Sequence, residues 1–575
     1  MPSARWVCAL LFLVLAPAAA AAPVHFTEPL LIDQARAGGE PVMWTDPIHK
    51  SIVYSSHAGT THLYRPGLAS GGALDFASTY RNQVFMWRST DDGRTFQRID
   101  YAGGFVTDPS KNTGFSDPDF TQDAGGRIYN TGIDLVNTAL FSSPDGGQTW
   151  DAGTVQCVPG DRPWLAGGAE DEVFLASNVD APAPGDPTHQ VFQSTDAGRT
   201  CPVRGIPAAG QTESGEDWTG NGKILFDQAT QTVVEPANFM AGGGAVTGVG
   251  IDTYKRGDAG FVPSKAADSS MFAHWPAIAI DDGGTLYLVW DDAPVSETAN
   301  DGCNGDPSPL PNHILMAYTK DLGKTWSAPI QVAAPSDHLV FWPWVAAGEA
   351  GKVSVVWYET DKVVDVGCMQ SQLSIKAATI LHADDDAHRT TEVTDAVGRP
   401  IADSDLCLSG TTCVATGEDR RLGDFFTNSV GLDGCVQIAS GDTTHKDPVT
   451  GGELPTSRPI FLRQNSGPRL RGSGDCSGAE DPGGSLGLPS TRKCTPRRRL
   501  VIRLRAPRHA KLRSAKVFVD GKRVKVRRRH GRLRAVIHLR AKTRGRFVVR
   551  IVARTTRGKV VRSKRVYRRC VKRNG

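Results

Sequence analysis

Short runs of alternating or wholly apolar residues recur along most of the chain, and turns rich in glycine, aspartate and serine separate them. Such runs are typical of β-strands in antiparallel sheets. Seven of them recur about 50 to 85 residues apart, an interval that fits four strands with their loops. The pattern therefore predicts an all-β chain whose main domain is a seven-bladed β-propeller. The runs span 84–88, 138–142, 190–193, 249–254, 314–318, 373–377 and 460–463.

A repeated turn motif supports this prediction. Four segments follow the pattern Ser/Thr-x-Asp-x-Gly-x-Thr-aromatic, with cysteine in the last place of the third. The aspartate can accept backbone N–H bonds across a tight turn, the glycine supplies positive φ, and the aromatic ring packs on the blade. The motifs span 89–96, 143–150, 194–201 and 319–326, with aspartates at Asp91, Asp145, Asp196 and Asp321.

These motifs resemble the Asp box, or BNR repeat, of the sialidase-like superfamily of β-propellers, and the resemblance covers roughly residues 24–465. In that family the box is the hairpin turn between the third and fourth strands of a blade, on the face opposite the ligand. The resemblance thus implies that the four box aspartates are structural. Sialidases have six blades and other Asp-box propellers have seven, so six blades is the alternative. The family's Phe/Tyr-Arg-Ile-Pro motif is missing and its arginine triad cannot be placed, so no catalytic residue is carried over.

The start of the mature chain predicts how the ring closes. Residues 27–32 (TEPLLI) match the segment that follows a box at 327–332 (SAPIQV). The first strand therefore resembles the outer strand of a blade, and the last blade ends near Asn465 without one. We expect residues 24–32 to pair beside 460–463, because this pairing removes open sheet edges.

Candidate chemistry lies at the axial mouth, where the inner strands converge. Alignment of the blades places charged and aromatic residues at the starts of first strands and the ends of second strands. Paired carboxylates there could act as acid and base or nucleophile in glycoside hydrolysis, and aromatic rings could stack on sugars. The catalytic candidates are Glu216, Asp217, Asp291, Tyr358 and Glu359. The ligand-binding candidates are Asp117, Arg162, His274, Trp342 and Asp424.

A structural interpretation of these residues stays open, because acids at strand ends often satisfy backbone donors in turns and tryptophans often fill blade cores. Trp164 and Trp344 share this ambiguity. No metal or cofactor is expected, since the sequence has no C-x-x-C pair and no histidine cluster with zinc-ligand spacing.

The first residues indicate export. Arg5 precedes an apolar run at 6–16 that is too short to span a bilayer, and small residues follow at 18–22. This is the pattern of a secretory signal peptide over residues 1–22. No later segment approaches the roughly 20 apolar residues of a membrane helix. We therefore expect a secreted protein that could be retained at the cell surface, with no transmembrane segment.

Ten cysteines remain in the exported chain, which favours disulfides. Cys201 replaces a box aromatic residue and Cys157 follows the preceding box, so a bridge between them could replace the lost packing. Spacing alone does not fix connectivity, and all five pairings are hypotheses. They are Cys157–Cys201, Cys303–Cys368, Cys407–Cys413, Cys435–Cys476 and Cys494–Cys570.

The net charge of +4 hides a strong asymmetry. From Arg492 onward the chain has 34 lysines and arginines against one acid, Asp520, a formal charge of +33, whereas residues 1–491 carry −29. A Gly/Pro/Ser-rich linker is expected at 466–493 after the propeller at 23–465, and a small basic β-sandwich at 494–575. Its strands are expected at 500–504, 516–519, 523–526, 533–539, 547–553 and 560–566, with a hairpin turn at 520–521.

Two explanations of this basic domain stay open. Its alternation of apolar and basic residues could simply place one face in solvent, or it could adhere to a polyanion such as an acidic glycan or envelope polymer. Specific nucleic-acid binding is disfavoured by export and by the near absence of aromatic stacking residues.

The sequence therefore supports two functional hypotheses. The first is a secreted, monomeric propeller that recognises a glycan or cell-envelope ligand at its axial mouth, with exo-sialidase-like glycoside hydrolase activity possible. The alternative is a noncatalytic surface scaffold or adhesin with a polyanion-binding C-terminal domain.

Overall fold

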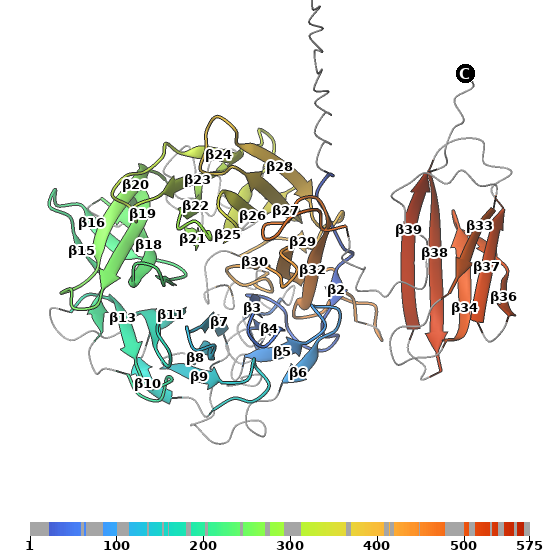
Figure 1. Ribbon diagram of the computed structural model, residues 1–575, viewed down its shortest axis with the longest axis horizontal. Coiled ribbons are helices and arrows are strands. Elements are labelled where there is room, and N and C mark those ends of the chain that lie inside the picture. Colours follow the sequence, from blue (N-terminus) through green and yellow to red (C-terminus); the bar gives the residue numbers. More distant parts are fainter. Residues whose placement is uncertain are drawn as a thin grey trace, which may run out of the picture.

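Seven small antiparallel sheets surround a common axis, and two further sheets are formed by the C-terminal part of the chain (Figure 1). The computed structural model describes residues 22–58, 62–64, 84–99, 114, 116–134, 137–151, 154–158, 160–179, 186–201, 205–241, 245–270, 276–292, 312–363, 370–407, 413, 419–447, 449–477, 499–504, 512–529, 532–538, 546–556 and 560–568. The predicted signal peptide and His274 fall outside the described residues.

Each sheet of the ring is one blade, and in every blade except the fourth the first strand lies nearest the axis and the fourth strand lies outermost (Figure 1). Blade 1 contains β3 (Val42–Asp46), β4 (Ser51–Ser56), β5 (Phe85–Ser89) and β6 (Gln97–Ile99). Blade 2 contains β7 (Ser116–Gln122), β8 (Ile128–Asp134), β9 (Asn137–Ser143) and β10 (Thr154–Val158). Blade 3 contains β11 (Asp161–Gly167), β12 (Val173–Asn178), β13 (His189–Ser194) and β14 (Ile206–Pro207).

The remaining blades include several short additional strands. Blade 4 contains β17 (Leu225–Asp227), which holds the inner position beside β11, β18 (Thr232–Met240), β19 (Val246–Lys255) and β20 (Val262–Asp268). Its β16 (Asp217–Gly220) pairs with the end of β18, and β15 (Ala209–Gln211) pairs with β16; both lie at the outer edge of the ring (Figure 1). Blade 5 contains β21 (Ala277–Ile280), β22 (Leu286–Asp292), β23 (His313–Thr319) and β24 (Ile330–Ala333). Blade 6 contains β25 (Val340–Ala347), β26 (Lys352–Thr360), β27 (Ser371–Leu381) and β28 (Thr390–Asp395), with β29 (Ala402–Ser404) on β27. Blade 7 contains β30 (Thr427–Val430), β31 (Val436–Asp442) and β32 (Arg458–Ser466).

The outer strand of blade 7 comes from the chain's N-terminal part. β1 (His25–Phe26) and β2 (Leu30–Leu31) both pair antiparallel with β32, and Leu30 lies opposite Phe461. The predicted closure is therefore confirmed. The seven apolar runs are the third strands of seven blades, so the alternative of six blades is wrong.

The four Asp boxes connect third and fourth strands and share one hydrogen-bond network. In the second box, the Asp145 carboxylate accepts bonds from the Ser143 hydroxyl at 2.9 Å, the Thr149 amide at 2.8 Å and the Thr149 hydroxyl at 2.7 Å. Gly147 has a φ of +80° and donates to Ser143 Oγ. Asp91, Asp196 and Asp321 make the equivalent bonds in their boxes.

Asp145→Ala is expected to lower the free energy of unfolding by about 1 kcal/mol, because it removes hydrogen bonds from an exposed turn without opening a core. It should leave binding or catalysis at the opposite face unchanged. Thermal denaturation together with a ligand assay checks both parts. Loss of function in a fully folded variant would place the functional face on the side of the boxes.

Aromatic side chains fill the centre of the ring. The Trp164 and Phe425 ring centroids lie 5.1 Å apart, and those of Trp164 and Trp344 lie 5.8 Å apart. These residues come from blades 3, 6 and 7, which are not all neighbours, so they meet across the axis. Lys223, from the break between β16 and β17, is also buried there and donates to Asp119 Oδ2 and the Leu165 carbonyl, each at 2.5 Å. The two tryptophans are therefore core residues in this structure.

The segment after the last blade strand remains attached to the ring. The Leu470 amide donates to the Gly434 carbonyl at 2.8 Å, Glu349 N donates to the Leu470 carbonyl at 2.8 Å, and Leu470 is fully buried. Arg471 forms an ion pair with Asp282 at 2.7 Å. Residues 467–477, expected as the first part of a linker, thus contact blades 5, 6 and 7.

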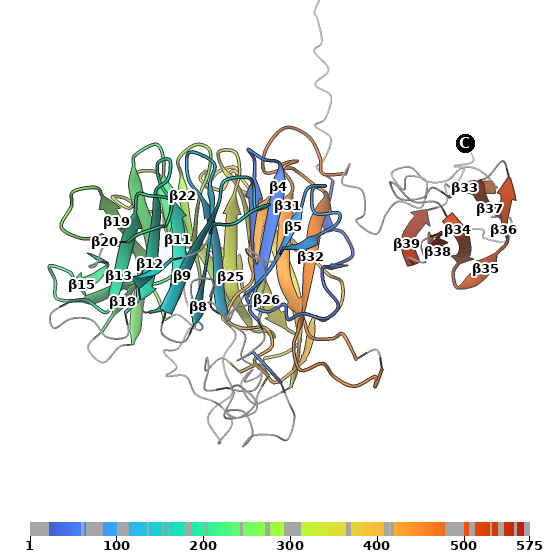
Figure 2. The ribbon, with the colours of Figure 1, turned by 90° about the horizontal axis from the view of Figure 1, so that it is seen from below.

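The C-terminal residues form two sheets with a common core (Figure 2). The first sheet has the order β33 (Arg499–Arg503), β37 (Arg532–His538) and β36 (Val526–Arg529). The second has the order β35 (Lys522–Val524), β34 (Leu512–Val519), β38 (Arg546–Thr555) and β39 (Val560–Arg568). The predicted turn is present, with positive φ at Asp520 and Gly521, as a two-residue hairpin requires.

Two of the five predicted disulfides are described, Cys407–Cys413 and Cys435–Cys476. Cys201 is also disulfide-bonded, but the side chain of Cys157 lies outside the description, so that pairing stays a prediction. The other four cysteines lie outside the described residues. Disulfides favour an extracytoplasmic compartment. In the described part of the chain, no helix is long and apolar enough to cross a membrane.

Candidate functional site

The mouth of the ring lies at the edge where first strands begin and second strands end. Neighbouring strands of a blade are antiparallel, so these two sets of ends share one face of the ring. The Asp boxes follow the third strands and therefore lie on the other face. Figure 2 shows the strands running between the two faces.

A strained residue followed by proline marks the mouth in four blades. Glu40, Asp117, Arg162 and Trp342 have φ values of +48°, +48°, +57° and +52°, and each precedes a proline. Side chains rarely adopt this left-handed conformation, and such strain of about 1–3 kcal/mol per residue clusters at functional sites. In blades 2, 3 and 6 the inner strand also changes register at this point, which is a bulge that re-aims a side chain.

Glu40 connects blades 1, 2 and 7 at the mouth. Its carboxylate accepts bonds from Ser116 Oγ at 2.8 Å and the Asp117 amide at 3.2 Å, and it pairs with His62 Nε2 at 2.9 Å. Arg420 Nη2 lies 3.9 Å from Glu40 Oε1. Burial alone would raise the pKa of Glu40, but the charge and hydrogen bond of His62 outweigh it and hold the pKa at about 2. Glu40 is therefore an ionised, buried link between blades.

Asp117 lies beside this link, and the pKa of its carboxyl group is shifted in the opposite direction. Burial raises the pKa of its carboxyl well above the usual range, and the negative charges of Glu40, Asp161 and Asp424 raise it further, while Arg162 opposes them. Two neighbouring carboxyl groups thus have pKa values shifted in opposite directions, as acid and base residues commonly do.

Two pairs of opposite charge surround Asp117. Arg420 and Asp424 form a bidentate, buried ion pair, with Nη2 to Oδ2 at 2.6 Å. Asp161 and Arg162 are more accessible, with 51% and 34% of their side chains exposed. A ligand approaching from solvent would therefore meet Asp161 and Arg162 before the buried groups. We refer to Glu40, His57, His62, Asp117, Asp161, Arg162, Arg420 and Asp424 as the mouth cluster.

Three of the ten predicted site residues, Asp117, Arg162 and Asp424, lie together in this cluster. Others form contacts elsewhere. In blade 4, Glu216 pairs with Lys265 at 2.7 Å, and Asp217 accepts a bond from Gln211 at 2.8 Å.

The predicted residues of blades 5 and 6 are largely buried. Asp291 is 1% exposed, and its carboxylate faces the Trp342 amide at 3.4 Å. Tyr358 is fully buried, stacks on Phe426 and bonds to Ser440 Oγ at 2.9 Å. Glu359 forms an ion pair with Lys376 at 3.2 Å. Trp342 packs against Tyr358, with ring centroids 5.8 Å apart.

Sequence reasoning missed Glu40, His57, His62 and Arg420. The signal for Glu40 was the residue-proline pair at the start of an inner strand, which recurs at 40–41, 117–118, 162–163 and 342–343. The histidines follow the second strand of blade 1 and have no counterpart in other blades. Their association with Glu40 depends on long-range folding, and His57 and His62 stack with ring centroids 4.1 Å apart.

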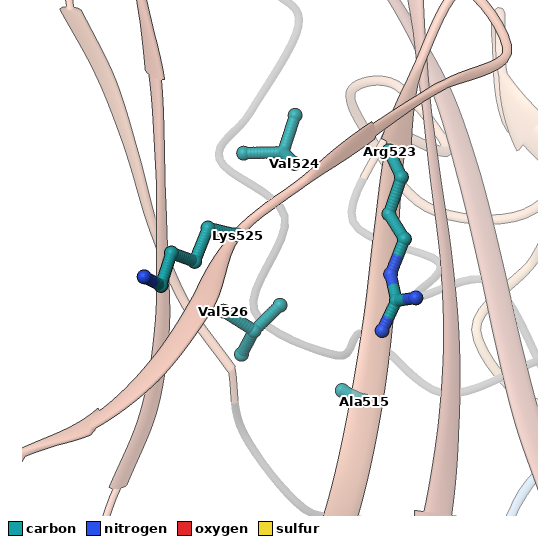
Figure 3. A pocket seen from close by; sticks show the side chains of 5 residues that line it. All are labelled: Ala515, Arg523, Val524, Lys525 and Val526. Carbon is teal, nitrogen blue, oxygen red and sulfur yellow. The ribbon is translucent and has the colours of Figure 1, made fainter.

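The C-terminal sheets contain a hollow of their own. A hollow of about 360 Å³ is lined by Ala515, Arg523, Val524, Lys525 and Val526. Figure 3 shows Arg523 extending toward Ala515 and Lys525 directed to the opposite side. Its two cations and apolar lining provide no acid–base pair. Among the described residues of the whole chain, no group of three or more His, Cys, Asp or Glu side chains is arranged to hold a metal ion.

No protein-family model matches the chain, and no curated protein matches it. Solved structures with a related fold include a protein of unknown function from Dyadobacter fermentans, at 14% identity and a TM-score of 0.39, covering 76% of this chain and 99% of that one. A fungal alcohol oxidase of the AA5 family, in complex with copper, has 10% identity and a TM-score of 0.43, covering 95% of this chain and 100% of its own. The intramolecular trans-sialidase from Ruminococcus gnavus has 10% identity and a TM-score of 0.35, covering 76% and 96%. Similarity this low carries no information on activity.

Proposed function

We propose that the protein is a secreted, sialidase-like Asp-box propeller that binds a glycan or other cell-envelope ligand at the mouth cluster, with glycoside hydrolysis as its possible reaction. The observation that carries the proposal is the convergence of Glu40, Asp117 and Arg162, three charged residues in strained conformations on consecutive blades. Strain of this kind persists only where the surrounding structure imposes it, and it concentrates at functional sites.

The chemistry of the cluster suits a hydroxylated ligand. Arg162 donates hydrogen bonds and the carboxyl oxygens of Asp161 accept them, so both can contact sugar hydroxyls. Asp117, held protonated by its surroundings, would be the general acid that protonates a glycosidic oxygen. Asp161 would be the base or nucleophile, since it is the more exposed carboxylate beside Asp117.

Asp117→Asn provides a direct test, because asparagine has the shape of the protonated carboxyl but cannot donate a proton to a leaving group. We expect folding and ligand binding to be retained and turnover to fall by a factor of about 10² or more. The assay is a panel of chromogenic glycosides combined with a glycan array. Asp217→Asn is the control with the same chemical change, since Asp217 begins the peripheral strand β16 of blade 4 (Figure 1) and accepts a hydrogen bond from Gln211. Full turnover by Asp117→Asn, or equal loss in both variants, would contradict the assignment.

A second candidate function belongs to the C-terminal sheets. Arg513, Lys516, Lys522, Arg550 and Arg554 are exposed, and the sequence has a single acidic residue, Asp520, after position 491. Such a surface attracts polyanions and releases their counterions on binding. This domain would then hold the protein on an anionic envelope polymer, whether or not the ring is catalytic.

A further inference from the structure

The three-stranded C-terminal sheet carries arginines in one row across its strands. The backbone register places Arg534 of β37 directly opposite Arg503 of β33 on one side and Arg527 of β36 on the other. Directly opposed residues of antiparallel strands belong to the same face of a sheet. The residues that alternate with them, Leu533 and Ala535, are buried in the core between the sheets. The row therefore belongs to the outer face.

This arrangement is unfavourable without an anion. Like charges directly opposite each other destabilise a pair of strands, and Asp520, the single acid after position 491, is in a hairpin of the other sheet. Arg527 is exposed, and the partly exposed Arg534 has a buried Nε with no hydrogen-bond partner among the described residues. Arg534 thus has a donor that the described residues leave unused.

We propose that Arg534 and Arg527 of this row bind consecutive phosphates of a phosphodiester-linked envelope polymer of the poly(glycerol phosphate) kind. The proposal deepens the second candidate function and rests on it. Arginine binds phosphate through two parallel N–H bonds, whereas lysine is only a point charge. Adjacent strands lie about 4.8 Å apart and residues i and i+2 about 7 Å apart, so arginines of the row can contact neighbouring phosphates of one extended polymer.

The register of the other sheet places basic residues opposite each other only in pairs, Arg546 with Arg568 and Arg550 with Lys564, and sets no three arginines in one row across its described strands, so it provides a control. Arg550 lies between Phe518 and Lys564 in the register, and Arg554 lies between Ser514 and Val560. The Arg550 guanidinium stacks over the Phe518 ring at 5.1 Å, which also leaves that ring less available for stacking on a nucleobase. We therefore expect nucleic acid to bind through its phosphates alone, with no additional affinity from base stacking.

The test measures binding of the full-length protein to synthetic poly(glycerol phosphate), single-stranded DNA and poly-glutamate of matched charge, at two salt concentrations. Wild type is expected to bind poly(glycerol phosphate) at least tenfold more tightly than poly-glutamate, with a strong salt dependence. Arg527→Gln with Arg534→Gln should weaken binding at least tenfold. Arg550→Gln with Arg554→Gln, which removes the same charge, should change it less than threefold. The double variant Arg527→Lys with Arg534→Lys, which keeps the charge, should still bind poly(glycerol phosphate) more weakly than wild type.

Other outcomes separate the row from general polyanion binding. Equal losses of affinity in the two glutamine double variants, or wild-type affinity in the lysine double variant, would contradict the proposed role of the row. Neither result would contradict the second candidate function. Equal affinity for poly-glutamate would overturn the preference for phosphate. Tighter binding to DNA would show that nucleic acid is the partner. Absence of binding to all three polymers would overturn the second candidate function itself.

Discussion

Glu40→Ala is expected to lower the free energy of unfolding by about 3 kcal/mol and to abolish ligand binding at the mouth. The carboxylate is 1% exposed and accepts bonds from two groups of blade 2 while pairing with His62. Removing one member of a buried charged network costs about 3–5 kcal/mol, because its partners remain buried without compensation. The Asp117 amide, which belongs to a residue in a strained conformation, would also lose the Glu40 carboxylate that accepts its hydrogen bond.

A control of similar burial separates the two effects. Glu172 is 3% exposed, lies in the turn between the first two strands of blade 3 and forms an ion pair with the partly exposed Arg256, with Nε to Oε1 at 3.0 Å. Glu172→Ala should also reduce stability but should leave mouth binding intact. Chemical denaturation and ligand titration of both variants provide the comparison. If Glu40→Ala kept full binding, or if both variants lost binding in proportion to stability, the assigned role of Glu40 would be wrong.

The pH dependence of Glu40 has a definite sign. Its folded pKa of about 2 lies below the ordinary value of 4.5, so its contribution to stability is fully present above pH 4.5 and is lost as the pH falls toward 2. Asp117 acts in the opposite direction, because its raised pKa makes the folded state bind the proton more tightly. Removing the negative charge in Glu40→Gln should lower the pKa of Asp117, since that charge is one cause of the shift.

The architecture could be predicted from the sequence because short local motifs that repeat along the chain determine it. Each Asp box closes its own hairpin through residues within eight positions, and each third strand carries its own apolar pattern, so blade number and ring closure could be predicted. The mouth was predicted only in part. Alignment of strand starts identified Asp117, Arg162 and Asp424, but their proximity depends on the order of blades around the ring.

Burial limited the predictions for aromatic and acidic residues. The local sequence around a tryptophan at a strand start does not tell whether its ring faces a ligand or packs in the centre of the propeller. Trp164 packs on Phe425, which comes from a blade that is distant in the chain. Glu216 and Glu359 have lysine partners from other strands of their own blades: Lys265 lies on β20, and Lys376 lies on β27, the neighbour of β26. Such pairings follow from register, which short alternating runs specify poorly until all blades are assembled.

Asp252→Asn is expected to stabilise the protein at alkaline pH. Asp252 of β19 lies directly opposite Glu235 of β18, and both residues are fully buried. Glu235 pairs with His189 Nε2 at 2.8 Å, whereas both carboxyl oxygens of Asp252 lack a hydrogen-bond partner among the described residues. Burial raises the pKa of both carboxyl groups well above their usual range, and the proximity of Glu235 raises that of Asp252 further.

The expected sign follows from proton binding. A carboxyl group whose pKa is raised by folding makes the native state bind more protons than the unfolded state, so stability falls as pH rises above the unfolded pKa of about 4. The slope is about 1.4 kcal/mol per pH unit for each such group until its folded pKa is reached. His189, whose pKa burial lowers to about 4, affects stability only below about pH 6.5. Measurements between about pH 7 and 9 therefore isolate the carboxyl groups.

Urea denaturation across this range should show that the stability of Asp252→Asn falls less steeply with pH than that of wild type. Asp268→Asn is the control, because the Asp268 side chain is 92% exposed in the same blade, and it should match wild type. Parallel curves for wild type and Asp252→Asn would show that this carboxyl group does not hold its proton in the folded ring.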